Sequence, residues 1–541
     1  MPRKTKHAAT RSRTSLWFAP SEPSHVIRPL ERISVAVSRP CTIAVTDGGG
    51  NEYHRGAAGP EAAFIVGGAL GMHTVTAYGS DGRKAATLSF AVDARTEIDD
   101  DRGVYKEFLR ILHKTMCCYS PTGDIAFEWR GRTYRYFVHW ILDHGHTAKG
   151  MQFFSPHTAG LVDLLRDVQR EDGMIWSNVN KDTGPGWYDT CYGPYGYARR
   201  TKGLLLVRQP VENHCEYNFV DAAWRAWKGS GDDAWMKRVL KACTKALDYT
   251  VNDRARWSGR FGLLKRGYCI DSWDFQAHDE YEPEFAVPSA MLIDPDRTKF
   301  GVFYGDNTGY TFACEQLAEM LEHAGRKKEA ARFRLRAAEM HKRLNDIAWN
   351  GRFYTHHVEE DPAVKRNFGV DEKSQISFSN AYSLNRNITD EQCKAIIGTY
   401  RDLLAHLPPG SPGEWYAIYP PFERGFGKEN AKWQYMNGGV HGHAAGELSL
   451  GAFEHGYERY GADILERMYR LGKKHGGKIY FAYTGAYPPP PPPQRFAPVD
   501  LSALANMDIT DAGSDTARRW MDDRAGNDMR NLPVGTQVFA G

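Results

Sequence analysis

The sequence predicts a multidomain, mainly α-helical protein, in which a small antiparallel β-sandwich is followed by a large ring of helical hairpins. A chain of 541 residues exceeds one compact core, because domains usually contain roughly 100 to 200 residues. Strand-like alternation of apolar residues is concentrated near the N-terminus. Apolar residues then recur at helical spacing from residue 98 to residue 487. A possible further β-domain starts near the end of the sequence.

Residues 1–24 are predicted to form a disordered basic tail. Its basic side chains are Arg3, Lys4, Lys6, Arg11 and Arg13. They are not followed by an apolar stretch long enough for a signal sequence or a membrane span. We therefore expect a soluble, cytoplasmic protein without a membrane partner.

Residues 25–97 are predicted to form an immunoglobulin-like β-sandwich. The predicted strands lie at 33–37, 42–45, 74–77 and 87–92. Glycine-rich and aspartate-rich turns at 47–51 and 79–82 separate them, as is typical of antiparallel strands.

Residues 98–487 are predicted to form helical hairpins. A long helix, a turn with glycine and a second helix recur at 219–249, 312–349 and 444–471, with the third turn expected at Gly461. Such hairpins build either an open superhelix or a closed double ring. Long loops at 176–203, 271–306 and 408–430 favour the ring, because loops of this length usually carry function and would gather at one mouth.

Residues 488–541 begin with a run of prolines, Pro488 to Pro493, which predicts a stiff polyproline spacer. The polar, turn-rich stretch after it ends in a strand-like pattern. We therefore expect the start of a truncated or partial β-domain there.

The composition excludes several classes of function. The net charge is only +3, from 69 basic and 66 acidic residues, which argues against nucleic acid as a partner. The nine cysteines include no C-x-x-C pair, and no histidine spacing matches a zinc site, so no disulfide framework, metal or cofactor is predicted. The 14 Trp, 28 Tyr and 25 Phe residues suit stacking on sugar rings. The oligomeric state is left open.

The stretch 266–275 is the first candidate for chemistry, because it places Asp271 and Asp274 among aromatic and apolar neighbours. Burial against apolar rings raises the pKa of a carboxyl group, and a second carboxylate nearby acts in the same direction. A general acid for glycosidic bond cleavage requires such a raised pKa. The alternative is a loop whose aspartates cap a helix.

Two short motifs resemble a known family. Trp-Asp-Phe at 273–275 is similar to the tripeptide of the trehalase signature, and Trp-Gln-Tyr-Met-Asn-Gly at 433–438 is similar to the second trehalase signature, Gln-Trp-Asp-Tyr-Pro-Asn-Gly. Residues 103–487 thus resemble the six-hairpin glycosidases, the (α/α)6 toroids that include trehalases, glucoamylases and glycogen-debranching glucosidases. The resemblance implies an (α/α)6 toroid and a glycoside hydrolase with Asp274 as general acid. An inverting enzyme that removes a terminal sugar from an oligosaccharide or polysaccharide is expected.

The general base is not fixed by the resemblance. In trehalases a catalytic glutamate lies in a Glu-Lys-Tyr element beyond the second signature, whereas residues 478–483 contain no carboxylate, so trehalase specificity is not implied. Glu414, in a Gly/Pro-rich loop beside aromatic residues, is ranked first. Glu447, on a helix after two histidines, is second and Glu216 is third. Each of them also fits a structural role.

The remaining candidates would bind the sugar. The aromatic candidates for sugar platforms are Trp187, Trp273, Trp415 and Trp433, and the polar candidates are Arg266, Glu216, Asp306, Asn437 and His441. Asn307 or Thr308 is expected to cap the helix that follows Asp306. Alternative functions are a phosphorylase or polysaccharide lyase on the same toroid, or a catalytically silent carbohydrate-binding scaffold.

Overall fold

The computed structural model describes residues 14–23, 25–115, 126–136, 139–182, 184, 197–209, 211–270, 298–424, 432–477, 479–480 and 482–486. Of the described residues, 40% are helical, which confirms the prediction of a mainly α protein. The predicted spacer and partial β-domain at 488–541 lie outside the described residues.

The N-terminal part consists of two antiparallel sheets. Its strands are β1 (Leu16–Ala19), β2 (Arg32–Val37), β3 (Cys41–Thr46), β4 (Glu52–Ala58), β5 (Glu61–Ile65), β6 (Gly71–Tyr78) and β7 (Lys84–Val92). The strand orders are β1-β2-β5 and β4-β3-β6-β7. Alternate apolar side chains from both sheets, among them Val35, Ile43, Val75 and Phe90, pack in one shared core. The four strands expected from the sequence coincide with β2, β3, β6 and β7.

Strand β1 corrects the predicted N-terminal tail, which was expected to extend to residue 24. Leu16 to Ala19 pair with β2 in register from Val37 to Ser34, and the Phe18 side chain is buried. The pairing of β1 depends on the edge of β2, which lies farther along the chain. The four residues of β1, next to a basic stretch, therefore did not predict a strand by themselves.

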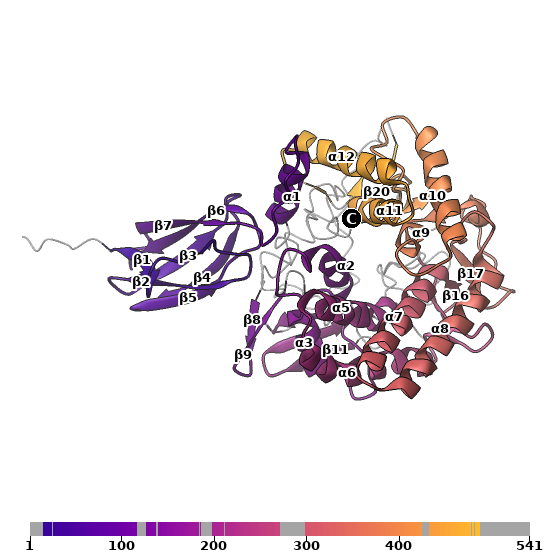
Figure 1. Cartoon of the computed structure of the whole chain (residues 1–541), viewed down its shortest axis with the longest axis horizontal. Helices are drawn as coiled ribbons and strands as arrows, with labels where there is room; N and C mark the ends of the chain where they lie inside the picture. The colour runs from indigo at the N-terminus through magenta and orange to yellow at the C-terminus, as the bar shows by residue number, and fades with distance from the viewer. Residues whose placement is uncertain are drawn as a thin grey trace, which may run out of the picture.

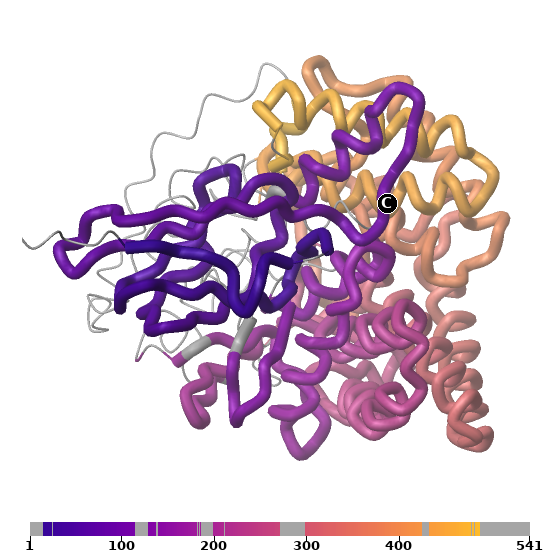
Figure 2. The backbone as a smooth tube through the Cα atoms, turned by 60° about the vertical axis from the view of Figure 1, so that its left-hand side comes forward, coloured from indigo at the N-terminus to yellow at the C-terminus, as the bar shows by residue number. Residues whose placement is uncertain are grey.

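The helical part contains an inner and an outer set of helices (Figure 1). The inner, largely buried helices are α2 (Ile141–Met151), α5 (His214–Ser230), α7 (Tyr304–His323), α9 (Ser379–Ser383) and α11 (Gly442–Glu454). The outer helices are α1 (Val104–Thr115), α3 (Gly160–Asp167), α6 (Asp233–Asn252), α8 (Lys327–Ala348), α10 (Asp390–Ala405) and α12 (Glu458–Lys474). The inner helices contact one another in chain order, and α1 lies against α12 (Figures 1 and 2).

The predicted hairpins correspond to α5 with α6, α7 with α8, and α11 with α12. The third turn was misplaced. It contains Gly456, whose φ of 81° suits glycine, whereas Gly461 lies inside α12. A Cβ atom at Gly461 would lie 3.0 Å from the Phe453 ring, so this glycine permits the close packing of α12 on α11.

The inner helices α2, α5 and α7 run parallel, because contacts between neighbours advance along both helices together. Gly145 of α2 lies against Asn218 of α5, and Gln152 at the end of α2 lies against Gly229 near the end of α5. Tyr217 likewise meets Asp306 near the start of α7, and Trp224 meets Glu319 farther along. The first turns of these helices therefore lie at one end of the inner set.

Short strands lead into that end. They are β8 (Ala126–Trp129), β9 (Arg132–Arg135), β10 (Asn178–Lys181), β11 (Tyr197–Thr201), β12 (Leu204–Arg208), β13 (Trp257–Ser258), β14 (Leu263–Leu264), β15 (Arg266–Gly267), β16 (Phe300–Phe303), β17 (His357–Glu359), β18 (Ile376–Ser377), β19 (Ile418–Tyr419), β20 (Val440–His441) and β21 (Ala482–Tyr483), with a short 3-10 helix η1 (Glu372–Ser374). Strand β16 continues directly into α7, and β20 continues into α11.

The start of α7 differs from the prediction, which placed its cap at Asn307 or Thr308. The helix begins at Tyr304, and both residues lie within its first turns. The Asn307 side chain instead accepts a hydrogen bond from the Leu264 backbone N–H at 2.8 Å and donates one to its carbonyl at 3.1 Å. Asn307 thus joins β14 to α7.

The two parts of the chain pack against each other. Leu30 and Ala94 belong to the core of the helical part, and the Nδ1 atom of His113 lies 3.3 Å from the Gly68 carbonyl oxygen. Among the described residues, no helix combines the length and the apolar character needed to cross a bilayer.

Candidate active site

Asp274, the expected general acid, lies outside the described residues, as do Asp271, Trp273 and Trp187. The described residues on both sides of segment 271–297 show where this segment joins the fold. Arg266 and Gly267 of β15 pair with Gly301 and Phe300 of β16, which runs into α7. Ile270, the last described residue before the segment, is buried. Both ends of the segment therefore attach beside the N-terminal end of α7.

Arg266 and Asp306 form a buried pair at this end. Both are almost completely inaccessible, and the Arg266 Nη1 atom lies 3.4 Å from each oxygen of Asp306. The Tyr217 hydroxyl lies 3.5 Å from the same carboxylate. These distances are long for charge-assisted hydrogen bonds. Asp306 is in the first turn of α7, where the helix dipole favours a negative charge.

Glu447 connects the last inner helix to the first. Its fully buried carboxylate accepts hydrogen bonds from the Lys149 ammonium, from His146 Nδ1 at 2.9 Å and from the Asn385 amide at 2.6 Å. Burial alone would raise the pKa of Glu447, but the Lys149 charge and the donated hydrogen bonds hold this pKa well below its usual range. Glu447 is therefore a carboxylate.

His146 is the neutral partner in this cluster. Burial, followed by the Lys149 charge, lowers the pKa of His146 to about 4. Since the Glu447 carboxylate can only accept, the imidazole carries its proton on Nδ1. Its buried Nε2 atom has no hydrogen-bond partner among the described residues.

Aromatic and cationic side chains fill the space between Glu447 and Asp306. The His146 ring lies 4.7 Å from the ring centre of Tyr382. The Arg386 guanidinium lies over the rings of Tyr382 and Tyr217, at 5.3 and 5.7 Å. The sequence reasoning missed His146, Lys149, Tyr382 and Arg386. A usable signal was Lys149 itself, the single Lys or Arg of α2.

Glu414 is bound to an outer helix. Its fully buried carboxylate accepts a hydrogen bond from the Tyr460 hydroxyl at 2.6 Å and two from the Arg467 guanidinium, at 2.8 and 2.9 Å. The same guanidinium lies 4.5 Å from the ring centre of Trp415, which is also fully buried. Glu414 therefore has the contacts of a packing ion pair, and Trp415 has no face open to a sugar.

Glu216, like Glu414, is buried and paired with an arginine. It accepts hydrogen bonds from Arg208 at 2.9 and 3.0 Å and from the Ile175 backbone N–H at 3.0 Å, and it is inaccessible to solvent. These contacts join α5 to β12. They satisfy the carboxylate fully, so this geometry gives Glu216 a structural role.

The second signature forms a tight loop before β20. Asn437 exchanges hydrogen bonds with the Phe422 backbone, at 2.7 and 2.9 Å, and is buried. His441 Nε2 bonds to the Tyr435 carbonyl at 2.9 Å, and burial lowers the pKa of His441 to about 4. Trp433 has a φ of 70° and lies beside Tyr416. Trp433 is partly exposed, whereas Asn437 and His441 are buried.

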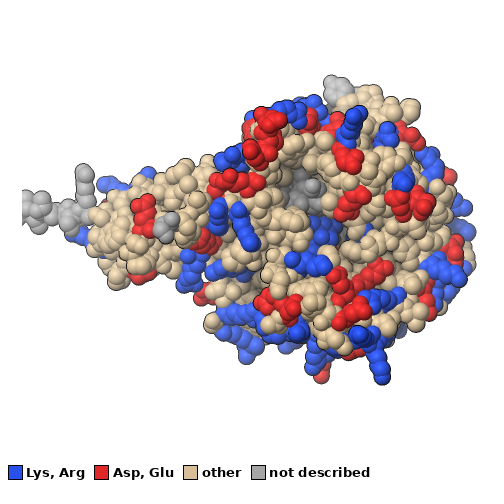
Figure 3. Space-filling model, viewed as in Figure 1, with Lys and Arg blue, Asp and Glu red and all other residues tan. Residues whose placement is uncertain are grey.

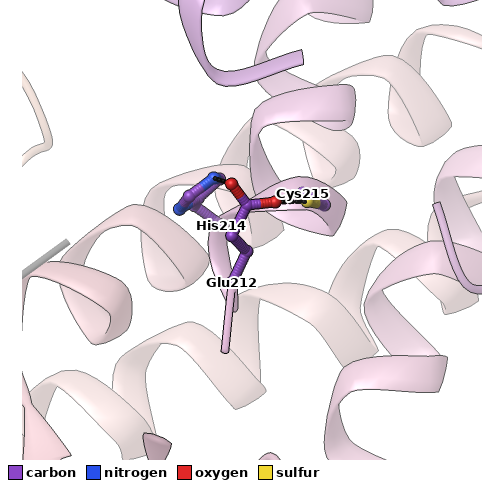
Figure 4. Close-up of side chains that lie close together, drawn as sticks. All are labelled: Glu212, His214 and Cys215. Atoms are coloured by element: carbon purple, nitrogen blue, oxygen red, sulfur yellow. Dashed lines mark hydrogen bonds and ion pairs between the residues drawn. The ribbon is translucent and has the colours of Figure 1, made fainter. Parts of the chain in front are cut away.

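In the described part of the chain, two clusters bring potential metal ligands within 4.8 Å of one another. One consists of Glu212, His214 and Cys215 at the start of α5 (Figure 4), and the other of His356, His357 and Glu372. In the first cluster the Glu212 carboxylate lies 3.4 Å from His214 Nε2 and 3.4 Å from the Cys215 sulfur. Burial raises the pKa of Cys215 well above its usual value, which keeps a thiol.

The face of the molecule in Figure 3 is hollowed near the centre of the helical part, and Lys or Arg side chains are visible there. A separate cavity of about 370 Å³ lies on the outer side, between α6 and α8. It is lined by Val251, Trp257, Leu335, Met340 and charged residues of α8, none of which the sequence analysis selected.

No protein-family model matches the sequence, and no curated protein matches it. Several solved structures are similar. The GH63 mannosylglycerate hydrolase from Thermus thermophilus, in complex with glucose, is 14% identical over 71% of this chain and 94% of its own, with a TM-score of 0.48. A rhamnosidase from Klebsiella oxytoca with rhamnose bound is 10% identical over 86% and 85%, with a TM-score of 0.45.

The GH78 family rhamnosidase of Bacillus sp. GL1 is 11% identical, covers 94% of this chain and 45% of its own, and has a TM-score of 0.48. These three proteins are glycoside hydrolases, the class of enzyme that the sequence motifs predicted. Since the TM-scores lie below 0.5, the reaction of this chain has to be inferred from its own residues.

Proposed function

We propose that the chain is a glycoside hydrolase that removes a terminal sugar from an oligosaccharide or polysaccharide, with Asp274 as the general acid. In this proposal the inner and outer helices form the (α/α)6 toroid of the six-hairpin glycosidases, and the N-terminal sheets form the expected β-sandwich. We keep the domain limits expected from the sequence as part of this proposal, with strand β1 moved from the tail to the β-sandwich.

The observation that carries the proposal is the attachment of segment 271–297. Asp274 follows Ile270 by four residues, and four residues of chain span at most about 14 Å. Ile270 itself follows β15, next to the N-terminal end of α7. Asp274 is therefore tethered within reach of the end at which the parallel inner helices begin.

The chemistry at that end supports a sugar site. The Arg266–Asp306 pair, the Tyr217 hydroxyl and the stacked Arg386 and Tyr382 supply charged donors and acceptors beside aromatic faces. Sugars offer hydroxyl groups to the former and apolar ring faces to the latter. Because the Arg266–Asp306 contacts are long, a bound hydroxyl can replace part of them at a small cost in free energy.

The second carboxylate is assigned by position. Glu414 and Glu216 are bound to α12 and β12, whereas Glu447 lies between inner helices. We therefore rank Glu447 above Glu414 as the general base, with Asp271 as a further candidate. Lys149 keeps Glu447 ionised, as a base requires, and one of its present partners must give way to the attacking water. An inverting reaction requires about 6.5 to 9.5 Å between the two carboxyl groups.

The test is a screen of chromogenic glycosides and natural oligosaccharides with the wild type, Asp274→Asn and the control Asp346→Asn, an exposed change on outer helix α8. Loss of general acid catalysis is expected to lower kcat about 10²- to 10⁴-fold in Asp274→Asn only. Proton NMR of the first product reports whether the anomeric configuration inverts.

Equal turnover by wild type and Asp274→Asn would remove Asp274 from its role. Cleavage that depends on phosphate would indicate a phosphorylase, and an unsaturated product that absorbs in the ultraviolet would indicate a polysaccharide lyase. Binding without any cleavage would indicate a carbohydrate-binding scaffold.

A further inference from the structure

Two histidines and a glutamate meet beside the strand that precedes segment 271–297. His357 is the first residue of β17, His356 directly precedes it, and Glu372 begins the 3-10 helix η1. Their ligand atoms lie within 4.8 Å of one another. The rings of Tyr268 and Phe303 enclose the two imidazoles, with the Tyr268 ring centre 4.6 Å from that of His357.

We propose that His356, His357 and Glu372 bind a divalent transition-metal ion, with Zn²⁺ as the best fit. His357 Nδ1 and the Glu372 carboxylate are 3.0 Å apart. Two ligands at about 2.0 to 2.1 Å from one Zn²⁺ lie roughly 2.9 to 3.4 Å apart for bond angles between 90° and 109°. Two histidines and one carboxylate, with a water molecule in the fourth position, form a ligand set that zinc accepts.

The surroundings provide the outer contacts that metal ligands usually have. Histidines that bind metals typically donate their second ring N–H to a carboxylate or a backbone carbonyl. His357 Nε2 lies 3.3 Å from the Glu359 carboxylate, and the Arg366 guanidinium donates to the same Glu359 oxygen. The backbone of Cys269 hydrogen-bonds to His356. Both imidazoles are therefore oriented.

Glu372 is oriented as well, because its carboxylate accepts a hydrogen bond from the Tyr268 hydroxyl. Its side chain is 21% exposed, which leaves a path for an ion to enter. Glu359 and Glu372 supply two negative charges against the single positive charge of Arg366, and these two carboxylates also favour a proton on His357. A bound ion would take the place of that proton and meet the same two negative charges.

The cluster of Glu212, His214 and Cys215 is less suited to an ion. Its side chains are 0 to 4% exposed, so no entry path is evident among the described residues. Arg208 donates to the Glu212 carbonyl and lies close enough to Cys215 to influence its thiol, which opposes a second cation. The Glu212 carboxylate already accepts hydrogen bonds from Ser177 and from Cys215.

An ion at His356, His357 and Glu372 would join three separate segments directly before residue 271. Tyr268 and Cys269 contact the cluster from the first segment, the two histidines form the second, and Glu372 forms the third. The metal would thus fix the start of segment 271–297. This inference does not depend on the glycosidase proposal.

The test measures Zn²⁺ binding to the full-length, chelator-treated protein by isothermal titration calorimetry. The wild type is expected to bind one equivalent, Glu372→Gln to lose at least a hundredfold in affinity, and Glu359→Gln about tenfold, since outer contacts typically contribute 10- to 100-fold. Tyr268→Phe removes the hydrogen bond to Glu372 without removing a ligand, so it is expected to keep binding with a loss of about tenfold, as for Glu359→Gln. His323→Gln, at a surface pair with Asp233, is expected to change nothing.

Absence of Zn²⁺ binding by the wild type would overturn the inference and leave a plain network of ion pairs. Undiminished binding by Glu372→Gln and by His357→Gln would also overturn it. Co²⁺ substitution locates the ion independently, because a cobalt–thiolate band in the near ultraviolet that disappears in Cys215→Ser would place it at Cys215 instead. A cobalt spectrum without that band, lost in Glu372→Gln, supports the proposed ligands.

Discussion

The buried pair of Lys149 and Glu447 is expected to control the stability of the inner helices. The Lys149 side chain is 7% exposed and the Glu447 side chain 0%, and the two residues lie on the first and last inner helices. Lys149→Met removes the charge and keeps the length of the side chain. Glu447 is then left as a buried charge with His146 and Asn385 as its remaining side-chain donors among the described residues. Breaking one half of a buried pair typically costs about 3 to 5 kcal/mol of unfolding free energy.

The double variant Lys149→Met/Glu447→Gln removes both charges. It is expected to regain most of the lost stability, because replacing a whole buried pair is often close to neutral. The same variant separates two roles of Glu447. If Glu447 only joins the helices, activity returns together with stability. If Glu447 is the general base, stability returns and activity stays absent.

Equilibrium unfolding in urea, followed by circular dichroism, measures the change, and thermal unfolding checks it. The roughly 390 residues of the helical part unfold with an entropy of about 0.8 kcal/mol/K, so a loss of 3 to 5 kcal/mol lowers Tm by about 4 to 6 °C. Lys394→Met, at an exposed pair with Asp390, is the control and is expected to leave Tm unchanged. A Tm within about 1 °C of wild type for Lys149→Met, or a double variant no more stable than the single one, would refute this reasoning.

Three further predictions concern the buried His113, two helical glycines and the cap of α10. Burial lowers the pKa of His113 to about 4, so its neutral form stabilises the fold above pH 6.5, and about 3 kcal/mol is lost as the pH falls from about 6.5 to about 4. Urea midpoints of His113→Gln should fall less over that range than those of wild type. Gly309→Ala would place a Cβ atom 2.5 Å from the Tyr217 ring and should lower the free energy of unfolding by about 1 to 3 kcal/mol. Gly398→Ala, in open space on α10, should instead raise it by up to about 1 kcal/mol. Changes of the same sign in the two variants would contradict this expectation. Thr389→Ala removes the capping box of α10 and should cost about 1 kcal/mol in the same assay, whereas Thr389→Ser should retain most of it.

The fold could be predicted wherever the signal was local. Strands β2, β3, β6 and β7 alternate apolar and polar residues, and the hairpins around α5, α7 and α11 combine helical spacing with glycine turns. Strand β1 and the exact turn between α11 and α12 were missed. The first depends on the edge of a distant strand, and the second on how closely two helices approach at Gly461.

The candidate site was predictable only as a set of residue types. The motif around Asp274 and the buried charges Arg266, Asp306 and Glu447 were selected from sequence context. Their partners were not, because Lys149 and Glu447 are 298 residues apart and meet only when the first and last inner helices come together. Glu414 was ranked first as the general base because of its loop context, yet Arg467 and Tyr460 of an outer helix occupy its carboxylate.

Local patterns along this chain determine which segments become strands and helices, since periodicity, caps and turns act over a few residues. Which charge faces which partner depends on helix contacts between residues far apart in the chain. A buried carboxylate becomes a candidate base or a packing ion pair according to the donors that tertiary packing brings to it. Only the folded arrangement of α2, α9, α11 and α12 decided that for Glu447 and Glu414.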